Sequence, residues 1–379
     1  MRRTMKRYYS ICCYLLVLLF VLTSCNQSSK KVDSRFIQKY QKKDLEYAKG
    51  FEIFNSDKDQ VLRIYNGKAN DSTYQEFKLV REKLAGDKSP NTIQVPCKKI
   101  ICLSSTQLTY FFALQDINRI VATNSSRHLF HEGINKRIED GSVKRVGKEG
   151  HFNTELIAGL NPDLIIVSPY KSGGYDALKN LGIPLVPMAA YDEKSPLGRA
   201  EWVKMIAPFV GKEKQADSLF QKIAFRYDSL KTLTKKVKIR PTVFSGKMKS
   251  GTWYVPGGKS FYANYFRDAG AKYIIEDDKQ GAYPLGFESV YTKAANADFW
   301  RILVPEPLGF GRKSLIEQDV RYADFKAYKK GNVIMCNIRE KPYYEQNAMK
   351  PDVILADYIH FFHPDLLPDY KPEFYEVLK

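Results

Sequence analysis

The sequence predicts an α/β protein made of two doubly wound lobes joined by one long rigid helix, with a small β-rich extension in front. Three observations favour this fold. A helix–loop–strand unit at residues 153–170 returns at residues 288–305. A stretch with helical apolar spacing, residues 212–236, contains neither Gly nor Pro. On either side of it, apolar strands alternate with helical segments, which is typical of parallel sheets covered by helices.

The first helix–loop–strand unit carries its own start and stop residues. Asn153 is a favourable N-cap, and Glu155 falls in the first helical turn, where the helix dipole favours a negative charge. Pro162 ends the helix because it cannot continue the hydrogen-bond ladder. Leu164–Val167 is an unbroken aliphatic run, as expected of a parallel strand buried on both faces. Tyr170 then follows at the carboxyl end, the edge at which open α/β sheets bind ligands.

The second unit, Glu288–Pro305, has the same plan: Glu288 early in a short helix, then Asn-x-Asp, then the strand Ile302–Val304. Two copies predict two similar lobes, each with one Glu in the same place. Between them, Lys212–Lys236 would form a helix about 37 Å long, which is suited to act as a strut. The alternative is a coiled-coil seam, for which the stretch offers only three heptads.

The first residues predict export. Residues 1–24 contain a basic start and an apolar run, Ile11–Leu22, that is too short for an ordinary membrane span. Small residues followed by Cys25 resemble a bacterial lipobox, which implies cleavage before Cys25 and attachment of a lipid there. The expected location is therefore periplasmic and lipid-anchored, with residues 25–49 as a tether. The alternative is an ordinary signal peptide followed by a chance cysteine.

Charge and cysteine content narrow the classes of partner. The formal charge is +18, and removal of the signal peptide leaves about +14. An exported protein has little access to nucleic acid, so the charge favours an anionic ligand or an anionic membrane surface. Cys97, Cys102 and Cys336 are expected to be buried free thiols, and no C-x-x-C pattern occurs.

The remaining segments follow in order. Residues 50–97 form the extension, which opens with a predicted hairpin at Phe51–Tyr65. Residues 98–198 form the first lobe, residues 199–237 the connecting helix and residues 238–379 the second lobe. The further strands expected are Lys99–Leu103, Arg119–Thr123, Pro184–Met188, Thr242–Ser245 and Val333–Cys336. Gly251–Gly258 is expected to be a loop and Asp352–Phe362 a closing helix.

From residue 98 onward the chain resembles the class III periplasmic solute-binding proteins. The resemblance is carried by four pieces in the family order. They are Glu155 followed by Asn161-Pro-Asp-Leu-Ile-Ile, Val255-Pro-Gly-Gly-Lys-Ser, Lys329-Lys-Gly-Asn-Val-Ile and Lys350-Pro-Asp-Val-Ile-Leu-Ala. The extension departs from the family's minimal pattern.

The resemblance implies a function. The family delivers iron–siderophore complexes, haem or cobalamin to ABC permeases, with the ligand held between the lobes. It implies that Glu155 and Glu288 dock onto the permease subunits, whereas the alternative is that they only stabilise their own helices. No cofactor is expected.

Loops at the strand ends supply the candidate ligand contacts. These loops are rich in Tyr, Trp and Arg, which suits a large planar or catecholate-bearing anion. The candidates are Arg127, Arg312 and Arg339 for the anion, and Tyr170, Trp253 and Tyr254 for stacking. His128 is a polar contact in the cleft, or an axial ligand to iron if the cargo is haem.

Three other functions stay open, one of which is a surface adhesion lipoprotein, which would not need two matched docking glutamates. The other two involve a metal ion. One is binding of a bare zinc or manganese ion, in which His128, His131 and acidic residues would converge. The other is an anchored metal-dependent hydrolase, for which the chain offers only five His. The sequence contains no G-x-S-x-G, Walker A or G-x-G-x-x-G motif, so it is not expected to be an enzyme.

Overall fold

The structure is a computed structural model, and it describes residues 39–65, 73–82, 89, 91–124, 129–148, 150–169 and 175–379. Contacts divide the chain into two compact units, residues 1–41 and 42–379, and the second unit carries the fold described below. Within the described ranges no helix is both long and apolar enough to cross a membrane. The predicted signal peptide and the predicted anchor Cys25 lie outside these ranges.

A five-stranded sheet in the order β1-β2-β3-β4-β5 is formed by the N-terminal extension together with residues 41–42, which lie in the segment predicted as a tether. Its strands are β1 (Gln41–Lys42), β2 (Phe51–Asn55), β3 (Asp59–Tyr65), β4 (Tyr74–Val80) and β5 (Thr92–Gln94). β2 and β3 pair antiparallel, which confirms the predicted hairpin. One face of this sheet packs onto the connecting helices, where the Phe51 and Trp202 rings lie 4.9 Å apart.

The first lobe is built on a parallel sheet in the order β12-β11-β6-β7-β8. The strands are β6 (Ile100–Cys102), β7 (Ile120–Thr123), β8 (Lys144–Arg145), β11 (Leu164–Val167) and β12 (Leu185–Pro187). The helices are η1 (Ile117–Arg119), α3 (Ser105–Ala113), α4 (Glu132–Glu139), α5 (Thr154–Leu160) and α6 (Asp176–Lys179). β9 (Gly147–Lys148) and β10 (His151–Phe152) form a separate antiparallel pair.

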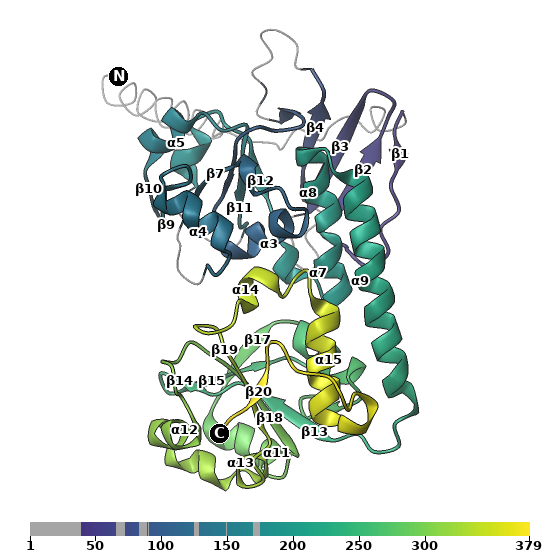
Figure 1. Cartoon of the computed structure of the whole chain (residues 1–379), viewed down its shortest axis with the longest axis vertical. Helices are drawn as coiled ribbons and strands as arrows, with labels where there is room; N and C mark the ends of the chain where they lie inside the picture. Colours follow the sequence, from purple (N-terminus) through teal and green to yellow (C-terminus); the bar gives the residue numbers. More distant parts are fainter. Residues whose placement is uncertain are drawn as a thin grey trace, which may run out of the picture. The chain divides into compact units, whose positions relative to one another are not determined.

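The connection between the lobes consists of η2 (Ala190–Asp192), α7 (Pro196–Glu201), α8 (Val203–Val210), α9 (Glu213–Leu233) and η3 (Thr234–Lys236). The predicted long helix is therefore confirmed as α9, with its last turn tightened to a 3₁₀ turn. Ala216, Phe220, Ile223 and Tyr227 recur at helical spacing and are buried. α9 packs on α8 and on α15 (Pro351–Phe362) of the second lobe (Figure 1), and its Gln215 amide donates to the Leu114 carbonyl of the first lobe at 3.3 Å, so α9 contacts both lobes.

The second lobe is built on a sheet in the order β16-β13-β18-β19-β20, parallel except for β20. These strands are β13 (Thr242–Ser245), β16 (Lys272–Tyr273), β18 (Phe299–Val304), β19 (Val333–Asn337) and β20 (Glu376–Val377). A three-stranded sheet adds β14 (Met248–Lys249), β15 (Thr252–Pro256) and β17 (Ala282–Leu285). The other helices are α10 (Phe261–Asp268), α11 (Phe287–Ala294), α12 (Arg312–Gln318), η4 (Val320–Asp324), α13 (Lys326–Lys329), α14 (Tyr343–Gln346) and η5 (Pro364–Leu366). The predicted fold class is thus confirmed.

The repeated Asn-x-Asp has the same structural role in both lobes. Asp163 accepts hydrogen bonds from the backbone N–H of Lys98 and of Lys99, at 2.5 and 2.8 Å, just before β6. Asp298 accepts one from the N–H of Thr242 at 2.8 Å, at the start of β13. Each Asp therefore fixes the beginning of the strand next to its own. This shared role gives the sequence repeat a physical reason.

One element expectation is wrong. Gly251–Gly258 is not a loop, because Thr252–Pro256 forms β15, which pairs antiparallel with β17. Pro256 is the last residue of β15, where its missing N–H does not break the ladder.

Candidate functional site

Each main sheet has one point at which the strand order reverses. In the first lobe this point lies between β6 and β11, and in the second between β13 and β18. Ligands of open α/β sheets bind beyond the carboxyl ends of the strands at such points. Thr106 and Gln107, just after β6, and Ser168, just after β11, line a space of about 40 Å³ between the lobes. Asn347 and Ala348 line it from the second lobe.

Gln107 is a polar residue in this space whose side chain has no hydrogen-bond partner among the described residues. Its side chain belongs to α3, and the residue is 2% exposed. Neither its amide nitrogen nor its amide oxygen has a hydrogen-bond partner among the described residues. A buried amide normally has such partners, so this one is available to a ligand or to water.

Arg199 lines the same space from α7. Its guanidinium donates to the carbonyl oxygens of Ala190 and Tyr191, at 3.3 and 2.9 Å, and its Cζ lies 3.8 Å from the centroid of the Phe261 ring. No described carboxylate forms an ion pair with it. The positive charge of Arg199 is therefore held in place without being neutralised.

Arg301 lies on β18 and is 3% exposed. Its Nε and Nη2 donate to the Tyr375 hydroxyl at 2.9 and 2.5 Å. Its Nη1 donates to the Ser245 hydroxyl at 3.4 Å. As with Arg199, no described carboxylate pairs with it. A guanidinium stays protonated in proteins, so this is a buried positive charge surrounded by phenols and a hydroxyl.

Tyr262 on α10 lies next to Arg301, whose Cζ is 4.1 Å from its ring centroid. The Tyr343 hydroxyl donates to the Tyr262 hydroxyl at 3.4 Å. Burial alone would raise the pKa of Tyr262, but Arg301, the hydrogen bond from Tyr343 and Arg199 outweigh it and lower the pKa below its ordinary value. The positive charges of Arg301 and Arg199 therefore both favour ionisation of the half-buried Tyr262 hydroxyl.

α14 joins the two lobes by direct contact. It packs against α3, and the buried Glu345 accepts hydrogen bonds from the N–H of Phe130 at 2.8 Å and of His131 at 3.2 Å. Burial raises the pKa of Glu345 despite these two hydrogen bonds. These hydrogen bonds hold α14 of the second lobe against the first lobe at the N-terminal end of α4.

Three of the predicted ligand residues, Arg127, His128 and Tyr170, lie outside the described residues. Trp253 does not reach a cleft surface. It is 0% exposed, its Nε1 donates to the Ser245 carbonyl at 3.0 Å, and its ring stacks on Trp300 in the core of the second lobe. Because β15 alternates, the neighbouring Tyr254 points the other way and is 52% exposed.

The two predicted arginines of the second lobe lie on loops after the main strands. Arg312 begins α12, and its Cζ lies 4.2 Å from the centroid of the Tyr328 ring. Arg339 is exposed just beyond β19. The amide of Asn337 donates to the Glu306 carbonyl at 3.0 Å, so the loops after β18 and β19 meet as the sheet topology predicts.

The two predicted docking glutamates are both exposed in the first turn of a helix. Glu155 lies in α5, after the N-cap Asn153, whose side chain accepts from the N–H of Leu156 at 2.9 Å. Glu288 lies in α11, and its side chain is 82% exposed and 3.8 Å from the Arg321 guanidinium. The equivalence of the two positions, predicted from the repeat, is present in the structure.

Histidines and thiols have structural contacts. His131 is the N-cap of α4 and stacks on Phe112, and His363 caps the end of α15. In the part of the chain that the structure describes, no group of three His, Cys, Asp or Glu side chains could hold a metal ion. Cys97, Cys102 and Cys336 are free and buried, as predicted. Burial raises the pKa of Cys97 and of Cys336 to about 12.

Sequence reasoning missed Arg199, Tyr262 and Arg301. Arg301 could have been identified from the sequence, because it is the only charged residue in the run Phe299–Val304. That run is otherwise apolar and forms a central strand. A charge inside such a run has to be paired or functional. Arg199 and Tyr262 sit in amphipathic helices and carry no comparable local signal.

Comparisons with known proteins agree with this geometry. A family profile described as periplasmic binding protein matches residues 100–340. An uncharacterized lipoprotein of Methanocaldococcus jannaschii is 29% identical over 364 residues, covering 87% of this chain and 84% of that protein. A second uncharacterized lipoprotein of the same organism is 26% identical over 317 residues, covering 78% of each.

Solved structures share the fold at low identity. The TroA-like periplasmic binding protein FepB from Veillonella parvula superposes with a TM-score of 0.56 at 19% identity, covering 74% of this chain and 90% of that one. IsdE of S. aureus, complexed with heme, gives 0.54 at 17%, covering 70% and 98%. Helicobacter pylori CeuE with bound Ni(II) gives 0.55 at 18%, covering 74% and 88%. Since the family profile spans well over half of the sequence, the chain belongs to the periplasmic binding protein family.

Proposed function

We propose that this protein is the substrate-binding lipoprotein of an ABC importer and captures an anionic iron chelate between its lobes. Iron–siderophore complexes, haem and cobalamin are the cargo classes, and among them ferric tris-catecholates and haem are anionic. One observation carries the choice of an anion. Arg199, which lines the space between the lobes, and the buried Arg301 both lower the pKa of Tyr262, and neither arginine has a described carboxylate partner.

The energetic argument rests on Arg301. A buried charge that lacks an opposite charge costs about 3–5 kcal/mol relative to a paired one. Phenol and hydroxyl oxygens from Tyr375 and Ser245 recover part of this cost as hydrogen bonds. An anionic ligand near Tyr262 would supply the missing negative charge. Arg199, which is only half-buried, would bind the ligand directly through its guanidinium fork.

Binding of a chelate requires a rearrangement. The space between the lobes measures about 40 Å³, whereas pockets for drug-sized ligands measure about 300–1,000 Å³. The second lobe narrows this space with Asn347 and Ala348, which directly follow α14, and α14 is held on the first lobe through Glu345. We infer that the lobes separate, or that α14 shifts, when the cargo enters.

Delivery would use the two exposed glutamates. Glu155 and Glu288 occupy equivalent places in the two lobes and would form charge-assisted hydrogen bonds with arginines of the permease. Cys25 would carry the lipid that keeps the protein at the membrane after export. Capture and release need no chemical step, so we propose that the protein is not an enzyme.

A bare metal ion is the second candidate cargo. The observation in its favour is that the Glu345 carboxylate accepts from the backbone N–H of His131, which places a carboxylate next to a histidine between the lobes. Two ligands are too few for a tight zinc or manganese site, and the His131 Nδ1 already accepts from the N–H of Ile134 at 3.4 Å. His128, the third residue of the sequence-based hypothesis, would have to complete the site.

Spectroscopic titration of the purified protein tests the proposal. Haem, cobalamin and a ferric tris-catecholate are added separately and followed by absorbance, and zinc and manganese are added in a calorimeter. Micromolar binding of an anionic chelate supports the proposal. Binding of cobalamin alone would retain the importer but remove the role of the arginines. Binding of zinc or manganese and of none of the chelates would contradict it.

A further inference from the structure

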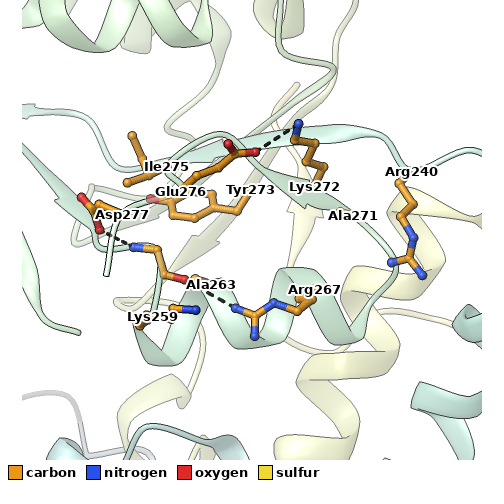
Figure 2. A pocket seen from close by; sticks show the side chains of 11 residues that line it. Arg240, Lys259, Ala263, Arg267, Ala271, Lys272, Tyr273, Ile275, Glu276 and Asp277 are labelled. Carbon is orange, nitrogen blue, oxygen red and sulfur yellow. Dashed lines mark hydrogen bonds and ion pairs between the residues drawn. The ribbon is translucent and has the colours of Figure 1, made fainter. Parts of the chain in front are cut away.

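A second cavity lies wholly within the second lobe. It has a volume of about 390 Å³ and is lined only by residues between Arg240 and Asp277 (Figure 2). It opens between α10 and the segment around β16, the edge strand of the sheet. None of its lining residues lines the space between the lobes, so the two cavities are separate.

Two guanidinium groups border this cavity. Arg267 donates to the Asn264 side-chain oxygen at 2.8 Å and to the Gly258 carbonyl at 3.4 Å. Arg240 donates to the Thr234 carbonyl at 3.4 Å. Neither forms an ion pair with a described carboxylate. Both side chains are exposed, so their charges can be offered to a ligand.

The two acids of the lining already have partners. Glu276 pairs with Lys272 at 3.0 Å. Asp277 accepts hydrogen bonds from the N–H of Gly258 at 2.8 Å, from that of Lys279 at 3.0 Å and from the Tyr283 hydroxyl. Burial would raise the pKa of Asp277, but these hydrogen bonds lower it overall, so this carboxylate stays ionised in its place. Because both acids are already partnered, the unpaired charges of Arg240 and Arg267 make the rim of the cavity positive.

The floor of the cavity is apolar. Ala263, Ala271, Tyr273 and Ile275 line it, and each is less than a tenth exposed. The Tyr273 hydroxyl is turned away and donates to the Pro256 carbonyl at 2.7 Å. The Gly258 backbone closes tightly on the segment after β16, because a Cβ there would lie 2.3 Å from the Asp277 carbonyl oxygen.

We propose that this cavity binds a small organic anion, with its phosphate or carboxylate group at the positive rim to which Arg240 and Arg267 contribute and an apolar body on the floor. Planar guanidinium forks match the geometry of both anionic groups. The volume lies within the range of about 300–1,000 Å³ that small-molecule sites occupy. The site is independent of the cargo, since it shares no residue with the space between the lobes.

Calorimetric titration of the full chain in a neutral maltoside detergent tests the site, with phenyl phosphate as the probe. Inorganic phosphate and phenol each present one half of the probe. We expect phenyl phosphate to bind with a dissociation constant of about 1 mM or tighter. We expect inorganic phosphate to bind at least about 10-fold more weakly, because it cannot cover the apolar floor. Phenol alone should show no measurable binding.

Variants locate the site. Arg267→Gln and Arg240→Gln should each weaken phenyl phosphate binding by about 10-fold or more, since each removes an exposed positive charge from the rim of the cavity. Lys235→Gln is the matched control, because it removes one exposed positive charge that does not line the cavity. Equal affinity of the arginine variants and this control would overturn the proposal. So would equal affinity for phosphate and phenyl phosphate, or no binding of phenyl phosphate to the unmodified chain.

Discussion

The Arg301 guanidinium carbon lies 4.1 Å from the centroid of the Tyr262 ring, while Arg301 itself is 3% exposed. A buried cation over a half-buried phenol changes the acidity of that phenol. Burial opposes ionisation of Tyr262, but Arg301 and the hydrogen bond from Tyr343 favour it more strongly, so the pKa is lowered. The pair therefore gives the site a titration signature.

An ultraviolet difference titration should detect this signature. We expect one phenol to ionise below the usual value near 10 and this phase to vanish in Tyr262→Phe. In Arg301→Met the phase should move to higher pH, because burial remains and the cation is gone. Tyr47→Phe is the control, since burial and Asp228 raise the pKa of Tyr47 to about 12. Persistence of the early phase in Tyr262→Phe would contradict the assignment.

The sign of the linked stability follows from the lowered pKa. Between the pKa of Tyr262 in the folded chain and the unfolded value near 10, the unfolded state binds more protons. The contribution of Tyr262 to the free energy of unfolding therefore rises with pH in that window. It is absent at lower pH, where both states are protonated.

The buried carboxylate of Glu201 is expected to fix the extension to the connecting helices. Glu201 is 0% exposed and accepts from the N–H groups of Glu46, Tyr47 and Ala48, at 3.0, 2.8 and 2.8 Å. It also pairs with the buried Lys204 at 2.8 Å. Glu201→Ala leaves a buried ammonium and three N–H groups without this acceptor.

We expect Glu201→Ala to lower the free energy of unfolding by about 3–5 kcal/mol, measured by urea denaturation. Glu213→Ala, in the first turn of the exposed start of α9, is the control and should cost no more than about 1 kcal/mol. A loss below about 1 kcal/mol in Glu201→Ala would show that the extension is not held in this way.

Release of α14 should let the lobes separate. Glu345→Ala removes the acceptor of the Phe130 and His131 N–H groups. We expect a loss of about 1–3 kcal/mol in the contact and a larger radius of gyration in small-angle X-ray scattering. Glu317→Ala, on the exposed face of α12, should leave the scattering curve unchanged. An unchanged curve for Glu345→Ala as well would show that other contacts hold α14.

The docking hypothesis predicts a transport defect without a binding defect. The double variant Glu155→Ala/Glu288→Ala should lose most uptake of a labelled ferric chelate into cells or proteoliposomes, because both permease contacts are gone. Its affinity for the chelate should be unchanged. Glu139→Ala/Glu317→Ala, one exposed helical glutamate from each lobe, should transport normally. Full transport by the first variant would remove the docking assignment.

Most of the fold could be predicted from the sequence, because the central strands are continuous apolar runs. Leu164–Val167 and Thr242–Ser245 begin and end where predicted. β15 escaped prediction because glycines flank it and Pro256 ends it, which is also the pattern of a loop. Local patterns report burial and turns, and β15 depends on pairing with β17, which follows it at residues 282–285.

The candidate site was less predictable, because its residues are far apart in the sequence and come into contact only when the chain folds. Glu345 bonds to Phe130, which is 215 positions away in the chain. The pKa of Tyr262 is lowered by Arg301, by the hydrogen bond from Tyr343 and by Arg199, which lie on different elements. No periodicity or spacing in the sequence encodes such encounters. Trp253 illustrates the converse, because an aromatic residue in a predicted loop became part of the core.

The charge on Arg199 gives the most direct test of anion capture between the lobes. The affinity of the unmodified protein and of Arg199→Gln is measured for an anionic ferric chelate and for a neutral ferric chelate of matched size. We predict that Arg199→Gln weakens binding of the anionic chelate by about 10-fold or more and that of the neutral one by less than about 2-fold. Equal affinity of both proteins for the anionic chelate, or an equal loss for the two chelates, would contradict the account.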